Sequence, residues 1–101
     1  MNSEYQSVYR QADALRYRFR DVVDNADDPE ARQLYRGLDN LAEDFEKERS
    51  PRSLEQSAKH LAEEFKRANS RPTEFMDPRH LSEFYSQLET IAHEVRKFSN
   101  Y

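Results

Sequence analysis

Apolar residues recur at alternating steps of three and four along four segments of the chain, with polar residues between them. This spacing places the apolar side chains of each segment on one face of an α-helix. It predicts helices at about residues 4–24, 29–49, 51–68 and 78–98. The apolar positions are Tyr5, Val8, Ala12, Leu15, Phe19 and Val22, then Ala31, Leu34, Leu38, Leu41 and Phe45, then Leu54, Ala58, Leu61, Phe65 and Ala68, and finally Leu81, Phe84, Leu88, Ile91, Val95 and Phe98.

The starts of these helices are marked by capping residues. Proline is favoured in the first helical turn, where its missing N–H has no helical partner, and Ser or Asp is favoured just before it. Three such pairs occur, Asp28-Pro29, Ser50-Pro51 and Asp77-Pro78. For the first helix, Ser3 and Gln6 have the spacing of a capping box, which predicts Ser3 as the N-cap.

Helices of similar length joined by short links favour antiparallel neighbours. The chain is therefore predicted to be all-α, a single domain over residues 1–101 that forms an up-down-up-down four-helix bundle. In the longest link, 69–77, we expect Phe75 and Met76 to fold over the open end of the bundle. The residues expected to share one core include Leu15, Phe19, Leu38, Leu41, Leu61, Phe65, Phe84, Leu88 and Ile91.

Composition narrows the possible chemistry. The 101 residues include no cysteine, which excludes disulfides, cysteine-ligated metal and thiol nucleophiles. The formal net charge is −4, from 16 Lys and Arg against 20 Asp and Glu, so overall charge does not favour nucleic acid or anionic lipid. Without an apolar run of membrane-spanning or signal-peptide type, we expect a soluble cytoplasmic protein with no membrane insertion.

Candidate catalytic or metal-binding residues do not converge. His60 and His93 fall on outward helix positions, and His80 lies in the first turn of the last helix. Segments 41–48 and 61–65 resemble the acidic helices of all-α nucleotide pyrophosphohydrolases of the MazG type, but Lys47 and Arg67 occupy the position of the third acidic residue. We therefore expect no catalytic residue, cofactor or metal, and a metal-dependent nucleotide hydrolase is the third of three hypotheses.

The first helix carries the most distinctive polar residues. Arginines interleaved with aromatic residues are typical of nucleic-acid-binding surfaces, and Arg10, Arg16, Arg18 and Arg20 occur here beside Tyr17 and Phe19. A small nucleic-acid-binding regulator is therefore the second hypothesis. Arg16 and Arg18, however, fall beside the apolar stripe, where we expect them to pair with carboxylates of neighbouring helices such as Asp39 or Asp44.

The preferred hypothesis is a non-enzymatic protein-binding module: an adaptor, inhibitor, assembly factor or immunity-type protein. Its predicted partner-binding residues are Arg10, Asp13, Tyr17 and Arg20, on the outward stripe of the first helix. Tyr and Arg are enriched at the energetic centres of protein interfaces. The sequence does not identify the partner, and it allows a homodimer. Gly37, the single glycine, indicates either close approach of a neighbouring helix or backbone access for a partner.

Residues 69–75 and 81–92 resemble the end of bacteriocin immunity proteins, mainly in the spacing of their apolar positions. Those are small cytoplasmic four-helix bundles that protect a producer cell by engaging a receptor complex. The resemblance implies the same fold class and action by protein binding. It assigns no functional residue to this chain.

Overall fold

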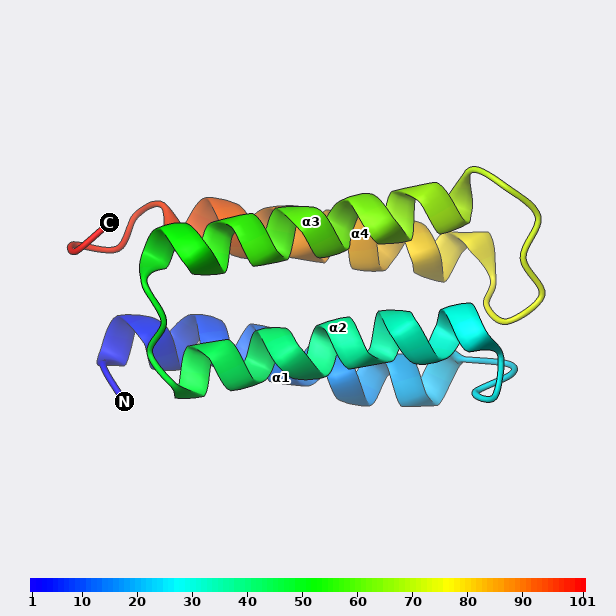
Figure 1. Cartoon of the computed structure of the whole chain (residues 1–101), viewed down its shortest axis with the longest axis horizontal. Coiled ribbons are helices and arrows are strands. Elements are labelled where there is room, and N and C mark those ends of the chain that lie inside the picture. Colours follow the sequence, from blue (N-terminus) through cyan, green and yellow to red (C-terminus); the bar gives the residue numbers. More distant parts are fainter.

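The computed structural model describes residues 1–101 and contains four helices and no strand: α1 (Ser3–Val22), α2 (Pro29–Glu46), α3 (Pro51–Asn69) and α4 (Pro78–Val95). Successive helices run in opposite directions, and both chain termini lie at the same end of the bundle (Figure 1). Each helix packs against the helices before and after it, and α1 also packs against α4. The predicted up-down-up-down four-helix bundle is thus confirmed, with overall dimensions of 41 × 20 × 18 Å.

Three of the four predicted N-cap residues, Asp28, Ser50 and Asp77, are confirmed. Asp28 accepts hydrogen bonds from the N–H groups of Glu30 and Ala31, and a proline occupies the first turn after it. Ser50 and Asp77 cap α3 and α4 in the same way. The prediction of Ser3 as the first N-cap is wrong, because the side chain of Asn2 accepts the N–H of Glu4 and Ser3 is already helical.

Three helices end two or three residues before the predicted boundary, at Val22, Glu46 and Val95. At the end of α2, Glu48 adopts a positive φ of 50°. The N–H of Arg49 then bonds to the carbonyl of Asp44, and that of Glu48 to the carbonyl of Phe45. This is the Schellman arrangement, in which a left-handed residue reverses the chain and satisfies the last carbonyls. It directs the chain into α3.

The core is formed within one chain. All nine residues named above as core residues are buried, in a single cluster of 25 side chains. Aromatic rings fill its centre: Phe65 and Phe84 stack with centroids 5.0 Å apart, and Phe19 contacts both. Phe98 also belongs to this cluster although it follows the end of α4. The apolar periodicity therefore identified the buried face of every helix.

Gly37 lies where α2 packs tightly against the side chain of Leu61 on α3. A Cβ atom at this position would lie 2.5 Å from Cδ1 of Leu61, well inside van der Waals contact. Because Leu61 is itself buried on α3, the absence of a side chain at Gly37 lets α2 and α3 pack closely. The structural interpretation of this glycine is sufficient, and no partner needs to be invoked for it.

Both ends of the bundle are closed by segments outside the helices. At one end Phe75 and Met76 are buried, as predicted, and the carbonyl of Phe75 accepts the N–H of Asp24 at 2.7 Å. At the other end the hydroxyl of Tyr101 donates to the carboxylate of Glu55, and Ser99 donates to Glu4. These contacts join segments that are far apart in sequence.

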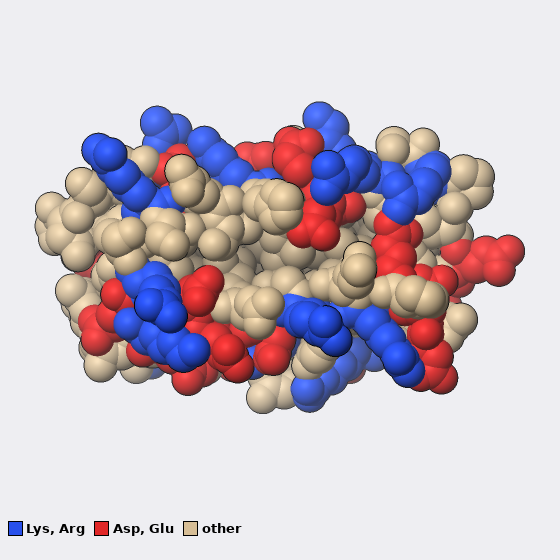
Figure 2. Space-filling model, viewed as in Figure 1, with Lys and Arg blue, Asp and Glu red and all other residues tan.

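Acidic and basic side chains are interleaved over the face formed by α2 and α3, and neither sign dominates a large area there (Figure 2). None of the four helices combines the length and the apolar character that crossing a membrane requires.

Candidate functional site

The outward stripe of α1 is exposed where the sequence places it. Tyr17 is 59% exposed, the largest value among the large apolar and aromatic side chains of the chain. Arg10 and Arg20 are also exposed, and neither forms an ion pair. The guanidinium of Arg20 lies 5.7 Å from the ring centroid of Tyr17, within the range of a cation–π contact. Tyr17 and Arg20 therefore form one surface feature, which we call the Tyr17–Arg20 pair.

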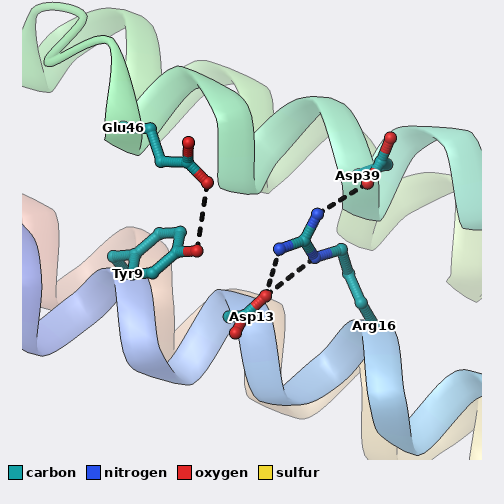
Figure 3. A network of polar contacts seen from close by, with 5 residues as sticks. All are labelled: Tyr9, Asp13, Arg16, Asp39 and Glu46. Atoms are coloured by element: carbon teal, nitrogen blue, oxygen red, sulfur yellow. Dashed lines mark hydrogen bonds and ion pairs between the residues drawn. The ribbon is translucent and has the colours of Figure 1, made fainter.

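Asp13, the fourth residue of the predicted site, is already engaged within the protein. Its carboxylate binds the guanidinium of Arg16 one turn later, and Arg16 also donates to Asp39 of α2 at 2.6 Å (Figure 3). Partial burial acts to lower the pKa of Arg16, but the hydrogen bonds to the two carboxylates outweigh it and raise the pKa above its ordinary value. A partner that used Asp13 would have to compete with this ion pair.

A second polar contact joins α1 to α2 on the same side of the bundle. The hydroxyl of Tyr9 donates to Oε1 of Glu46 at 3.0 Å (Figure 3). This hydrogen bond raises the pKa of the Tyr9 hydroxyl, because ionisation would place a negative charge beside a carboxylate. Together with the Arg16–Asp39 contact, it links α1 to α2 along their outer edge.

Arg18 is engaged on the opposite side of α1. Its Nε lies 3.0 Å from Oε2 of Glu83 on α4, which raises the pKa of Arg18 and lowers that of Glu83. The prediction that Arg16 and Arg18 pair with carboxylates of neighbouring helices is thus confirmed. Arg16 binds Asp39, as predicted, whereas Arg18 binds Glu83, which was not predicted. Asp44, the other carboxylate considered, lies 4.0 Å from Arg49 instead.

Two hollows flank the Tyr17–Arg20 pair. On the α2 side, a cavity of about 440 Å³ opens between the end of α1 and the start of α2, and Arg20 lines it. On the α4 side, a shallower hollow of about 700 Å³ is lined by Tyr17, Leu15 and Arg18. Neither hollow was predicted from the sequence, although the short link between the first two helices places Arg20 and Arg36 at the same end of the bundle.

The three histidines remain apart, with His60 and His93 exposed on α3 and α4 and His80 partly buried at the start of α4. His60 lies 3.3 Å from Glu64 one turn later, a contact between neighbours on one helix. No group of three or more histidine or carboxylate side chains is placed to hold a metal ion. The geometry therefore gives the hydrolase hypothesis no specific support.

Comparison with the models of known protein families, with curated protein sequences and with solved structures gave no match. The resemblances to immunity proteins and to pyrophosphohydrolases accordingly assign neither a family nor a function.

Proposed function

We propose that the protein acts by binding another protein through the outer face of α1, with the Tyr17–Arg20 pair at the centre of the interface and Arg10 at its edge. The observation that carries the proposal is the exposure of Tyr17. A tyrosine that is 59% exposed, beside an arginine with no carboxylate partner, offers an aromatic ring and a free guanidinium, the two groups most enriched at the energetic centres of protein interfaces. Adaptor, inhibitor, assembly-factor and immunity-type roles all use such a surface.

Nucleic-acid binding through the arginines of α1 is the alternative, and the ion pairs favour it less. Phosphates would have to displace Asp13 and Asp39 from Arg16, and Glu83 from Arg18. The unpaired Arg10 and Arg20 leave few contacts for a polyanion, whose binding free energy comes mainly from the number of phosphates neutralised. A salt-sensitive gel shift that Arg16→Ala or Arg18→Ala abolishes would reverse this preference.

The proposal is tested with Tyr17→Ala. The tagged protein is used to capture its partner from extracts of the native cell, and affinity for that partner is then measured by titration. We expect Tyr17→Ala to weaken binding more than tenfold, since an aromatic anchor at the centre of an interface typically contributes about 2 kcal/mol or more. Its free energy of unfolding should change by no more than about 0.5 kcal/mol, as for other surface positions.

Gln56→Ala, at an exposed position of α3, is the matched control and should leave affinity unchanged. A large loss of stability in Tyr17→Ala would show that the side chain belongs to the core. Unchanged stability together with unchanged affinity would place the interface on another face and overturn the proposal.

A further inference from the structure

The cavity between α1 and α2 combines an apolar lining with positive charge. Its apolar part comes from Phe19 and Val23 at the end of α1 and Ala31 at the start of α2, and its charged part includes Arg20 and Arg36. The volume of about 440 Å³ is in the range of small-ligand sites, which are mostly apolar with a few polar groups that fix orientation. An occupant therefore needs an apolar body and a group that arginine binds.

Three arginines line this cavity, and two of them, Arg20 and Arg36, have no carboxylate partner, whereas Arg32 lies 3.3 Å from Asp27. Arg16 and Arg18 are held by carboxylates of α2 and α4, whereas Arg20 and Arg36 form no ion pair. The one carboxylate that lines the cavity, Asp39, is bound to Arg16 (Figure 3). The local charge is thus positive in a protein whose formal net charge is −4. Guanidinium groups bind carboxylates bidentately, so the cavity is complementary to an anion.

Tyr35 adds a second, independent observation. Its ring lies 5.2 Å from the guanidinium of Arg20, so Arg20 is held between the rings of Tyr17 and Tyr35. Its hydroxyl is the one buried side-chain nitrogen or oxygen in the chain without a hydrogen-bond partner. An unsatisfied buried hydroxyl is destabilising, and such groups are uncommon in folded proteins. Tyr35 also lines the cavity, so an oxygen atom bound there is a candidate partner for this hydroxyl.

We propose that this cavity receives an acidic side chain together with an adjacent apolar side chain from the partner protein, with Arg20 and Arg36 binding the carboxylate. The inference rests on the proposed function, because Arg20 belongs both to the Tyr17–Arg20 pair and to the cavity. It adds the chemistry of the partner: an acidic residue beside a bulky apolar one. The apolar lining favours a carboxylate on a hydrocarbon body over a bare inorganic anion.

The test uses a small probe, so it does not depend on knowing the partner. The ¹⁵N-labelled full chain is titrated with 3-phenylpropionate, which carries a carboxylate on an apolar body, and with the neutral 3-phenylpropionamide of the same shape. We expect the carboxylate to bind with a dissociation constant on the order of millimolar, as suits so small a ligand. Chemical shifts should change at the Nε–H groups of Arg20 and Arg36, and the amide should bind at least about fivefold more weakly.

Two arginine variants and a matched control locate the binding. Arg20→Ala and Arg36→Ala should each weaken binding of 3-phenylpropionate about fivefold or more. Arg52→Ala is the control, because Arg52 lies 5.7 Å from the ring of Tyr101, also makes no ion pair and is remote from the cavity. Equal binding of the carboxylate and the amide, or equal weakening by Arg52→Ala, would overturn the proposal.

Tyr35→Phe distinguishes a binding role for the hydroxyl from a structural one. Removing a buried hydroxyl without a partner should leave thermal stability unchanged or raise it. Affinity for 3-phenylpropionate should nonetheless fall by about threefold or more, because the carboxylate loses a donor. A clear loss of thermal stability would show that the hydroxyl already has a structural partner and does not donate to the ligand.

Inorganic phosphate is titrated in parallel as a test of the alternative anion. Binding of phosphate at the same arginines, tighter than that of 3-phenylpropionate, would contradict the apolar requirement and point to a phosphorylated partner. The outcomes also separate the two proposals. Failure of 3-phenylpropionate to bind, with Tyr17→Ala still weakening the partner, refutes the cavity proposal and keeps the proposed function. Binding of 3-phenylpropionate, with Tyr17→Ala leaving partner affinity unchanged, refutes the proposed function and keeps the cavity only as a carboxylate-binding site.

Discussion

At the scale of single residues, Glu48 bears the clearest backbone strain, because it is the one residue of the chain with a positive φ. A side chain in the left-handed region costs roughly 1–2 kcal/mol, and glycine avoids this cost while losing more entropy on folding. Glu48→Gly is therefore expected to raise the free energy of unfolding by about 0.5–1 kcal/mol. Urea denaturation measures this change.

Glu48→Ala is the control for this prediction. It removes the exposed contact between the Glu48 carboxylate and the N–H of Asn2, at 3.3 Å, but keeps a Cβ in the left-handed region. We expect no gain in stability from it. If alanine stabilised the protein as much as glycine, the effect would come from the side chain and not from the backbone.

Glu55 predicts a pH dependence of stability. This glutamate is buried on α3, where the hydroxyl of Tyr101 donates to it and Lys59 and Arg96 lie at 3.1 and 3.4 Å. These contacts lower its pKa, the Tyr101 hydrogen bond most of all. A lowered folded-state pKa means that its contribution is complete above the ordinary glutamate value of about 4.3 and is lost as pH falls through the folded value.

We therefore expect Glu55→Gln to lower the free energy of unfolding by about 1–3 kcal/mol at neutral pH, the range for hydrogen bonds to charged groups. The difference from the wild-type protein should shrink as pH falls toward about 3, because the wild-type carboxyl becomes neutral as well. Urea denaturation across this pH range measures it, with Glu63→Gln at an exposed position of α3 as the control for loss of a charge. A difference that does not change with pH would show that Glu55 stabilises the protein through its packing and not through its negative charge.

At the scale of elements, the α2–α3 contact depends on the missing side chain at Gly37. Alanine is favoured over glycine in a helix by about 1 kcal/mol, but its Cβ would clash with Leu61, and overpacking a core typically costs about 1–3 kcal/mol. Gly37→Ala should thus destabilise the wild-type protein by up to about 2 kcal/mol. In a Leu61→Ala background, where the clash is absent, it should stabilise by about 1 kcal/mol.

A double-mutant cycle measured by urea denaturation gives the coupling between Gly37 and Leu61. The change of sign between the two backgrounds is the expected result. Additive effects would mean that Leu61 moves aside at no cost and that the glycine has another reason to be there.

At the scale of the whole molecule, the single core predicts cooperative unfolding. Leu88 is fully buried on α4, in the same cluster as residues from the other three helices. Leu88→Ala should lower the free energy of unfolding by about 2–5 kcal/mol, a large part of the 5–15 kcal/mol typical of a domain. Circular dichroism and tyrosine fluorescence should report one coincident urea transition, shifted to lower urea. Two separate transitions would show that the hairpins of the bundle unfold independently.

The spacing of apolar residues was enough to identify the fold and the buried face of each helix, because both follow from the helical repeat and from local capping. Asp28, Ser50 and Asp77 act on N–H groups two or three residues away, so their role is visible in sequence. The exposure of Tyr17 follows from the same periodicity. Asn2 and Ser3 are both suitable caps, and only the conformation at the start of α1 decides between them.

The Arg16–Asp39 pair was expected from the sequence, but the other contacts between distant side chains were decided by tertiary structure. Arg18 binds Glu83, 65 residues away, because α1 packs beside α4 in one particular register. The ends of α2 and α4 depend on the turn at Glu48 and on the burial of Phe98 beyond the last helix. The cavity at Arg20 and Arg36 exists only where two helices meet. A repeat along one helix fixes which side chains face inward, but the partner across an interface depends on the relative position of two helices, which no local pattern encodes.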